Sequence, residues 1–150
     1  MEAEFDMETV VGIVPFDEVC LGIRTEVFVH EQGVPPELEE DGKDPESVHF
    51  LATVAEKPVG TARLRWLEAR VAKVERVAVL ASHRRLGVGR RIMDRVEEYI
   101  RERGGTRIVL AAQSSVLNFY AQRGYRVEGD PFLDAGIDHR WMTRSAAPKE

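Results

Sequence analysis

At 150 residues the chain has the length of one domain with a buried core. Apolar residues make up 43% and charged residues 31%, which is ordinary for a globular protein and disfavours a disordered or membrane-spanning chain. The single cysteine, Cys20, excludes an intrachain disulfide, and the acidic N-terminus does not resemble a targeting signal, so we expect a cytoplasmic protein.

The net charge of −5 is unevenly distributed along the chain. Residues 1–60 carry 15 Asp and Glu against 3 Lys and Arg, whereas residues 61–150 carry 11 against 18. Two solvated surfaces would explain this pattern. The functional alternative is a basic side for a polyanionic coenzyme and an acidic side that attracts a cationic substrate. Nucleic acid is disfavoured, because the basic half lacks interleaved aromatic side chains.

The first third of the chain predicts a strand, a helix and an acidic loop. Residues 9–14 are largely β-branched and precede a proline, which favours a strand. Apolar residues at helical spacing predict a helix from residue 16 to about Gly33, with Cys20 on its buried face. Residues 34–47 are rich in acids but lack the EF-hand ligand spacing, so we favour a mobile loop near a substrate entrance over a metal site.

Three strands then predict an antiparallel meander over residues 48–55, 59–67 and 71–80. In the second strand polar side chains alternate with apolar ones, which predicts one polar face carrying Thr61, Arg63 and Arg65. The third strand ends in an apolar run, as expected of a strand that enters the middle of a sheet.

A basic loop with two glycines follows the third strand and opens into an amphipathic helix over residues 88–103. Unpaired N–H groups and the positive end of the helix dipole converge there, and glycines let a ligand approach the backbone. The loop therefore predicts a site for a pyrophosphate. A Walker A ending is absent, and a dinucleotide fingerprint would need a third glycine and a parallel βαβ unit.

The remaining sequence predicts a buried strand over residues 107–112 and a helix that Ser114 or Ser115 caps and Gly124 ends. Two final strands are expected over residues 125–128 and 139–143, separated by a loop. The tail from Ser145 is expected to be frayed.

Two motifs identify a family. The loop reads Arg84-Arg85-Leu86-Gly87-Val88-Gly89, and some thirty residues later stands Phe119-Tyr120-x-x-x-Gly124-Tyr125. Together they resemble the GNAT acyltransferase superfamily over essentially the whole chain. More narrowly, the chain resembles the ElaA-like branch of this superfamily in three places: Val27-Phe28-Val29-x-Glu31-Gln32, the acids around Glu39 and Asp41, and Gly136-Ile137-Asp138-His139-x-x-Met142.

The resemblance implies an α+β fold in a single GNAT domain. Its central sheet would be mostly antiparallel, with six to seven strands splayed at the CoA site and about four flanking helices. The co-substrate would be acetyl-CoA, with no metal. The residues implied to bind CoA are Val77, Ala78, Val79, Arg84, Arg85, Leu86, Gly87, Val88, Gly89, Arg90, Gln113 and Asn118. For Gln113 and Asn118, helix capping or surface solvation is the alternative.

Tyr120 matches the family's general acid for the departing CoA thiolate; the alternative is an aromatic packed under the helix. A phenol with an ordinary pKa of about 10 is protonated at neutral pH and suits this role. Glu75 is the candidate base, because regular alternation places it on one face with Val77 and Val79. The alternative for Glu75 is a cross-strand salt bridge.

Glu31, Glu39 and Asp41 are candidate contacts for a substrate ammonium, and His139 is a candidate lining residue of the acceptor pocket. Packing or a structural hydrogen bond is the alternative for His139, and zinc is disfavoured because no Cys/His cluster accompanies it.

These patterns predict an acetyl-CoA-dependent N-acetyltransferase that acts on a primary amine of a small cationic molecule by direct attack in a ternary complex. No nucleic acid or membrane partner is expected, and the protein would be a monomer or homodimer. Two alternatives stay open: acetylation of a protein lysine or N-terminus, and a non-catalytic acyl-CoA sensor.

Overall fold

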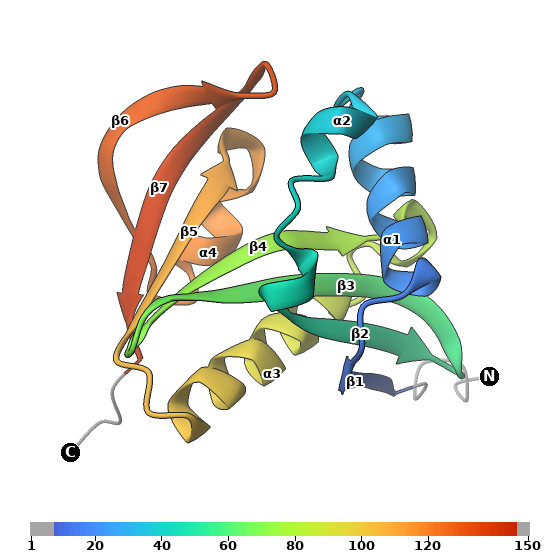
Figure 1. Ribbon diagram of the computed structural model, residues 1–150, viewed down its shortest axis with the longest axis horizontal. Coiled ribbons are helices and arrows are strands. Elements are labelled where there is room, and N and C mark those ends of the chain that lie inside the picture. The colour runs from blue at the N-terminus through green and yellow to red at the C-terminus, as the bar shows by residue number, and fades with distance from the viewer. Residues whose placement is uncertain (1–7, 147–150) are drawn as a thin grey trace. The chain divides into compact units, whose positions relative to one another are not determined.

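The computed structural model describes residues 8–146, which form a seven-stranded sheet with four α-helices (Figure 1). The strands lie in the order β1-β2-β3-β4-β5-β7-β6. β4 pairs with β5 in parallel, whereas β1–β2, β5–β7 and β6–β7 are antiparallel. The predicted mixed, mostly antiparallel sheet is thereby confirmed.

The strands are β1 Thr9–Val14, β2 Val48–Val54, β3 Lys57–Glu68, β4 Val71–Val79, β5 Arg107–Gln113, β6 Arg126–Asp134 and β7 Ile137–Ser145. The α-helices are α1 Glu18–Arg24, α2 Pro36–Glu39, α3 Val88–Glu102 and α4 Leu117–Ala121. Shorter or irregular helical segments are η2 Thr25–Glu31, η3 Asp44–Glu46, η4 Ala81–His83 and η5 Ser114–Val116.

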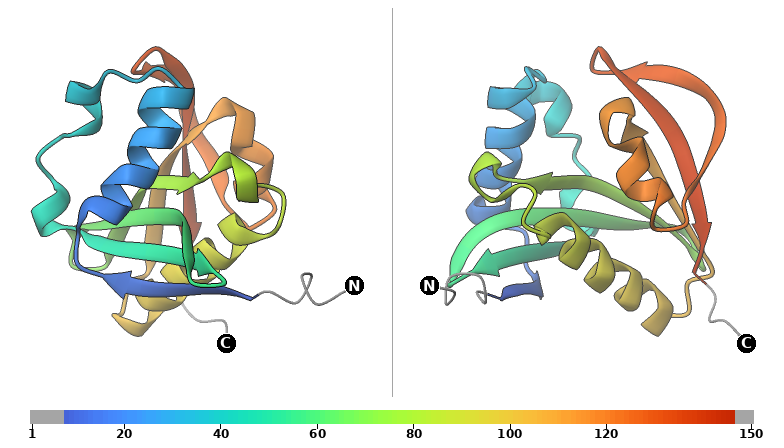
Figure 2. Two further views of the ribbon diagram at one scale, coloured as in Figure 1. Left: turned by 90° about the vertical axis from the view of Figure 1, so that its right-hand side faces the viewer. Right: turned by 180° about the vertical axis from the view of Figure 1, so that it is seen from behind.

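The described residues divide into two compact units. The first unit comprises residues 8–63 and 76–96, and the second comprises residues 64–75 and 97–146. Within the first unit, α1 and the first half of α3 lie on opposite faces of β2 and β3 (Figures 1 and 2). Ile23 and Val27 pack with Ala78 in a buried apolar cluster. A β-carbon on Gly60 would lie 2.9 Å from Ile92 Cδ1, so α3 side chains pack directly on the backbone of β3 there.

In the second unit, β5, β7 and β6 form a sheet with α4 against one face (Figure 1). The buried face carries Ile108, Leu110, Ala112 and Met142. The parallel register of β4 and β5 runs only from Val71↔Arg107 to Val74↔Leu110. It ends there although β5 continues to Gln113, which agrees with the expected splaying of the sheet.

The predicted N-terminal helix is present but changes type. Asp17 caps α1 by accepting hydrogen bonds from the backbone N–H groups of Val19 (3.0 Å) and Cys20 (3.3 Å). The seven residues of η2 then continue as a π-helix, and the Gln32 N–H donates to the Val27 carbonyl, five residues earlier. Apolar spacing cannot separate these two helix types, because both keep one side buried.

The loop predicted between the last two strands was wrong, because β6 runs through it to Asp134. Its Gly, Asp and Pro form an irregularity between Glu128 and Phe132, and the Gly129 carbonyl accepts a hydrogen bond from Arg140 at 2.8 Å. β6 is the last strand of the sheet, where a proline costs no ladder hydrogen bond. The true turn is tight, with Ala135 and Gly136 both at positive φ.

Two smaller predictions near the C-terminus are also corrected. Neither Ser114 nor Ser115 caps α4, which starts at Leu117; the Ser114 hydroxyl donates instead to Asp138 at 3.0 Å. Ser145 ends β7 and Ala146 is buried, so these two residues are not frayed. The rest of that predicted tail, residues 147–150, lies outside the described residues. Among residues 8–146, no helix is long and apolar enough to cross a membrane.

Candidate active site

The loop between β4 and α3 has the backbone form of an anion cradle. Arg85 and Gly87 both adopt left-handed conformations, with φ of 65° and 87°. Left-handed residues next to ordinary ones turn successive N–H groups into a shared concavity. α3 begins immediately afterwards at Val88, and its first turn carries N–H groups without helical acceptors and no acidic side chain. The loop therefore has a backbone conformation that can present several N–H groups to one anion.

The side chain of Arg84 is engaged by the protein itself. Its Nε donates to the Val79 carbonyl at 2.8 Å, and its Nη1 donates to Glu31 Oε2 at 2.9 Å. The hydrogen bond with Glu31 raises the pKa of Arg84 and lowers the pKa of Glu31. Two residues predicted for different ligands are thus brought together as an ion pair.

The segment Val77–Val79 leads into this loop. Ala78 is buried against α1, whereas Val77 and Val79 are half-buried. Just before it, Arg76 adopts a left-handed conformation with φ of 56°. Such a residue interrupts the regular alternation of a strand. The expectation that Glu75 shares a face with Val77 and Val79 rested on unbroken alternation, and it does not hold across Arg76.

Glu75 belongs to the second unit and is held by two cations. Its carboxylate accepts hydrogen bonds from Arg65 Nε (2.9 Å) and Nη2 (3.2 Å), and Lys73 Nζ lies 2.9 Å from Oε2. The cross-strand salt bridge considered as the alternative for Glu75 is therefore present.

Tyr120 is buried in α4 with its ring edge-on to Phe119 and Tyr125, at centroid distances of 4.9 and 5.7 Å. Among residues 8–146, no group forms a hydrogen bond with its hydroxyl. Burial raises the pKa of Tyr120; the charge of Arg123 lowers it and the charge of Glu97 raises it. The phenol is thus protonated at neutral pH.

The acids of the predicted mobile loop are bound by arginines. Arg24, Arg63 and Arg76 contact Glu39, Asp41 and Asp44, and we call these six residues the arginine–carboxylate network. Burial would raise the pKa of Asp41, but hydrogen bonds from Arg63 and from the Lys43 N–H lower it well below its ordinary range. A substrate ammonium would have to compete with these guanidinium groups for Glu39 and Asp41.

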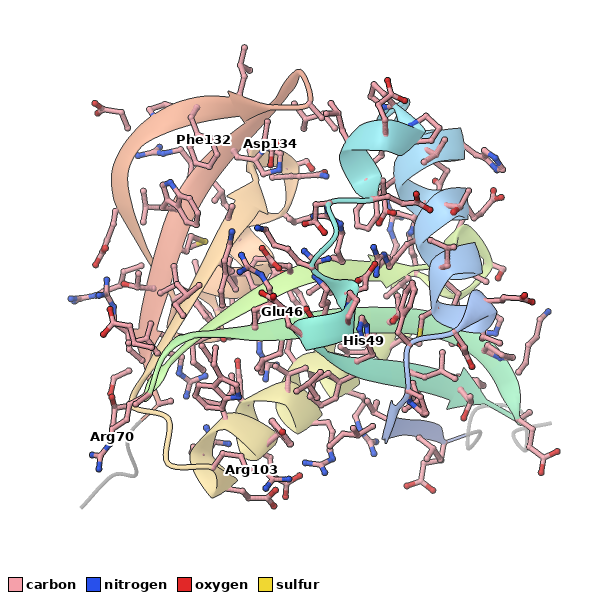
Figure 3. All side chains as sticks on the ribbon, in the orientation of Figure 1. Glu46, His49, Arg70, Arg103, Phe132 and Asp134 are labelled. Carbon is pink, nitrogen blue, oxygen red and sulfur yellow. The ribbon has the colours of Figure 1, made fainter. Side chains whose placement is uncertain are left out.

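The network was missed at the level of the sequence. The alternation of Thr61, Arg63 and Arg65 indicated a polar face, but it gave no sign that this face is buried. In the structure Thr61 and Arg63 are 1% and 0% exposed. A nearby histidine, His49 (labelled in Figure 3), hydrogen-bonds through Nε2 to the Asp44 carbonyl at 3.0 Å and adds to the burial.

The other predicted residues of the second unit lie on β5, α4 and β7. Gln113 and His139 are register partners, and Asn118 is in α4. His139 Nδ1 donates to the Ile137 carbonyl at 2.7 Å, which fixes the ring and leaves Nε2 as its acceptor nitrogen. Its ring stacks on Phe132 (labelled in Figure 3), 5.7 Å between centroids. The structural hydrogen bond considered for His139 is thus present.

Another buried carboxylate lies outside the network and was not found from the sequence. Glu97 is one of the charged residues of the amphipathic helix over residues 88–103, yet it is 3% exposed. It accepts hydrogen bonds from Arg123 (2.8 Å), Tyr125 (2.9 Å) and Arg144 (3.2 Å). No spacing rule signals a single buried acid within a charged helix, because its partners come from later in the chain. Among residues 8–146, no group of three or more His, Cys, Asp and Glu side chains is placed to hold a metal ion.

Comparison with known proteins identifies the family. The family model for the acetyltransferase (GNAT) domain matches residues 6–146. The "Uncharacterized N-acetyltransferase YjcF" of Bacillus subtilis (strain 168) is 44% identical over 123 residues, which cover 81% of this chain and 87% of YjcF.

Two solved structures have the same fold. Escherichia coli ElaA superimposes with a TM-score of 0.78 at 24% identity, covering 92% of this chain and 99% of ElaA. A GNAT family acetyltransferase from Elizabethkingia anophelis, solved with acetyl-CoA bound, gives a TM-score of 0.74 at 14% identity. The superposition covers 91% of this chain and 97% of that protein. The family model and YjcF establish that the chain belongs to the GNAT acetyltransferase family and is an acyl-CoA-dependent N-acetyltransferase.

Proposed function

We propose that the protein transfers an acetyl group from acetyl-CoA to the primary amine of a small cationic molecule. The observation that carries the coenzyme assignment is the loop in which Arg85 and Gly87 are left-handed directly before α3. Its N–H groups over residues 85–90 would bind the pyrophosphate. Val77–Val79 would bind the pantetheine, with Gln113 and Asn118 as further hydrogen-bonding partners. The E. anophelis relative with acetyl-CoA bound supports this assignment by analogy.

In the proposed reaction the amine nitrogen attacks the thioester carbonyl, a C–N bond forms, and the C–S bond breaks. Tyr120 donates its phenolic proton to the departing thiolate. The N–H of Val79 would polarise the thioester carbonyl. Glu75 would accept the proton of the substrate ammonium. Because its carboxylate is engaged by Arg65 and Lys73, we assign this transfer to a bridging water molecule rather than to direct contact.

The acidic residues 1–60 support a cationic acceptor, because their excess negative charge raises its local concentration. Glu31 is the most exposed of the three acids predicted to contact the acceptor, with its side chain 31% accessible. Glu39 and Asp41 would attract the acceptor through their negative charge rather than by direct contact. His139 would line the acceptor pocket with its Nε2.

Calorimetric titration with CoA tests the coenzyme assignment with a matched pair of glycine variants. Gly87 and Gly104 both have a left-handed φ (87° and 83°) and open space where a β-carbon would stand. Gly87→Ala and Gly104→Ala therefore impose similar backbone strain. We expect Gly87→Ala to weaken CoA binding at least about tenfold and Gly104→Ala to leave it within about twofold, since only Gly87 borders the proposed ligand. Equal affinities in the two variants would refute the assignment.

The acceptor class is tested by mass spectrometry of products from acetyl-CoA and a panel of small amines, lysine peptides and peptide N-termini. Acetylation of small polyamines or diamines in preference to peptides is expected. Preferential acetylation of peptides would contradict a small-molecule acceptor and indicate that the acceptor is a protein. CoA binding without product from any acceptor would indicate a sensor.

A further inference from the structure

Arg76 is a left-handed residue inside a strand. The other non-glycine residues at positive φ among residues 8–146 lie in turns or in the basic loop: Ala55, Glu56, Arg85 and Ala135. A side chain with a β-carbon disfavours this conformation, so it persists only where the surroundings impose it. Val74 is the last residue of β4 that pairs with β5, and Arg76 lies two positions after it. Arg76 directly precedes Val77–Val79.

The guanidinium of Arg76 supplies that restraint. Its Nε donates to Glu39 Oε2 at 3.2 Å, and its Nη2 donates to the Glu39 backbone carbonyl at 2.9 Å. Nη2 also reaches Asp41 Oδ2 at 3.4 Å. Arg76 thus holds both a side chain and the main chain at the end of α2.

The acceptors of Arg76 are themselves fixed. Glu39 is 4% exposed and accepts a second hydrogen bond from Arg24 at 2.6 Å. Asp41 accepts two from Arg63, at 2.9 and 2.8 Å. Asp44 accepts hydrogen bonds from both Arg24 and Arg63, at 2.8 and 3.1 Å. The network contains three cations and three anions, so it is balanced in charge and rigidly cross-connected.

We propose that Arg76 is a positioning residue: by binding Glu39 and Asp41 it holds the left-handed break in β4 and so sets the path of Val77–Val79. This inference rests on the proposed function, in which that segment binds the coenzyme. It also gives the loop acids a role different from substrate contact. Glu39 and Asp41 shape the coenzyme-binding strand through Arg76.

Three variants separate the side chain's role from backbone strain. Arg76→Gly removes the guanidinium and relieves the left-handed strain, and Arg76→Lys keeps the charge but loses the forked contacts. Glu56→Gly relieves comparable strain (φ 68°) in the exposed turn between β2 and β3 and serves as the control. Each is measured by calorimetric CoA affinity and by hydrogen exchange of the backbone amides of residues 77–79 in the ligand-free protein.

We expect Arg76→Gly to weaken CoA binding at least about tenfold and to accelerate amide exchange over residues 77–79, with Arg76→Lys intermediate and Glu56→Gly unchanged. Unchanged affinity and exchange in Arg76→Gly would overturn the inference. If Arg76→Gly does not fold, Arg76→Lys provides the same two readouts. A wild-type protein that fails to bind CoA would refute the proposed function, whereas the exchange comparison would still test Arg76.

Discussion

Arg84 binds the carboxylate of Glu31 across 53 positions of the sequence. The pair joins the end of η2 to the loop that precedes α3, and both side chains are partly exposed, at 41% and 31%. Arg84 therefore restrains the loop while its charge is balanced by Glu31. A phosphate group that approached the loop would compete with Glu31 for this guanidinium.

Replacement of this partner gives the first prediction. Glu31→Gln should strengthen CoA binding by about two- to fivefold, because an exposed ion pair of about 0.5–1 kcal/mol no longer competes for Arg84. Calorimetry checks this, with Glu26→Gln as the control, since Glu26 pairs only locally with His30. Weaker binding in Glu31→Gln would mean that Glu31 is needed to shape the loop.

Tyr120→Phe should lower turnover by about 100-fold or more and leave CoA affinity unchanged, because it removes only the proposed proton donor. The variant should keep its stability, since no described group hydrogen-bonds to the hydroxyl. Initial rates and calorimetry give the two readouts. Tyr125→Phe is the control, and it should cost about 1–2 kcal/mol of stability by removing the hydrogen bond to Glu97 while turnover of the folded enzyme persists. Normal turnover in Tyr120→Phe would remove Tyr120 as the acid.

Gly60→Ala should destabilise the fold by about 1–3 kcal/mol. The new β-carbon would lie 2.9 Å from Ile92 Cδ1 and 3.2 Å from the Ala78 carbonyl, so the Ile92 side chain and the β4 backbone would have to move. Gly12→Ala in β1 meets nothing within 4 Å and should be neutral within about 0.5 kcal/mol. Urea unfolding of both variants makes the comparison, and similar midpoints would contradict the close packing of α3 on β3.

Asp41→Asn should remove part of the protein's sensitivity to acid. Because the folded-state pKa of Asp41 lies below its unfolded value of about 3.9, its contribution is present above about pH 4 and is lost as pH falls toward the folded value. At pH 7 the variant should be about 1–3 kcal/mol less stable than the wild type. The difference in urea midpoint should shrink between pH 4 and pH 2.5, and a constant difference would argue against the depressed pKa.

The sequence by itself determined the elements and the family. Strand and helix positions followed from apolar periodicity, and the loop from Arg84 to Gly89 marked the helix start, because these signals are local. Predictions from local composition failed where pairing with a distant strand determined the structure. Gly129 and Pro131 indicated a loop, yet β6 tolerates them as an edge strand whose partner, β7, fixes its course.

Only the tertiary structure decided which charges are available for chemistry. Glu31, Glu39 and Asp41 read alike in the sequence, but each is paired with an arginine that lies 15 to 53 positions away in the chain, which no spacing rule reveals. The break at Arg76 likewise required the network that imposes it. Local patterns specified where the double-glycine loop before α3 lies, whereas the partners of each ionisable group depended on which distant segments the fold brings into contact.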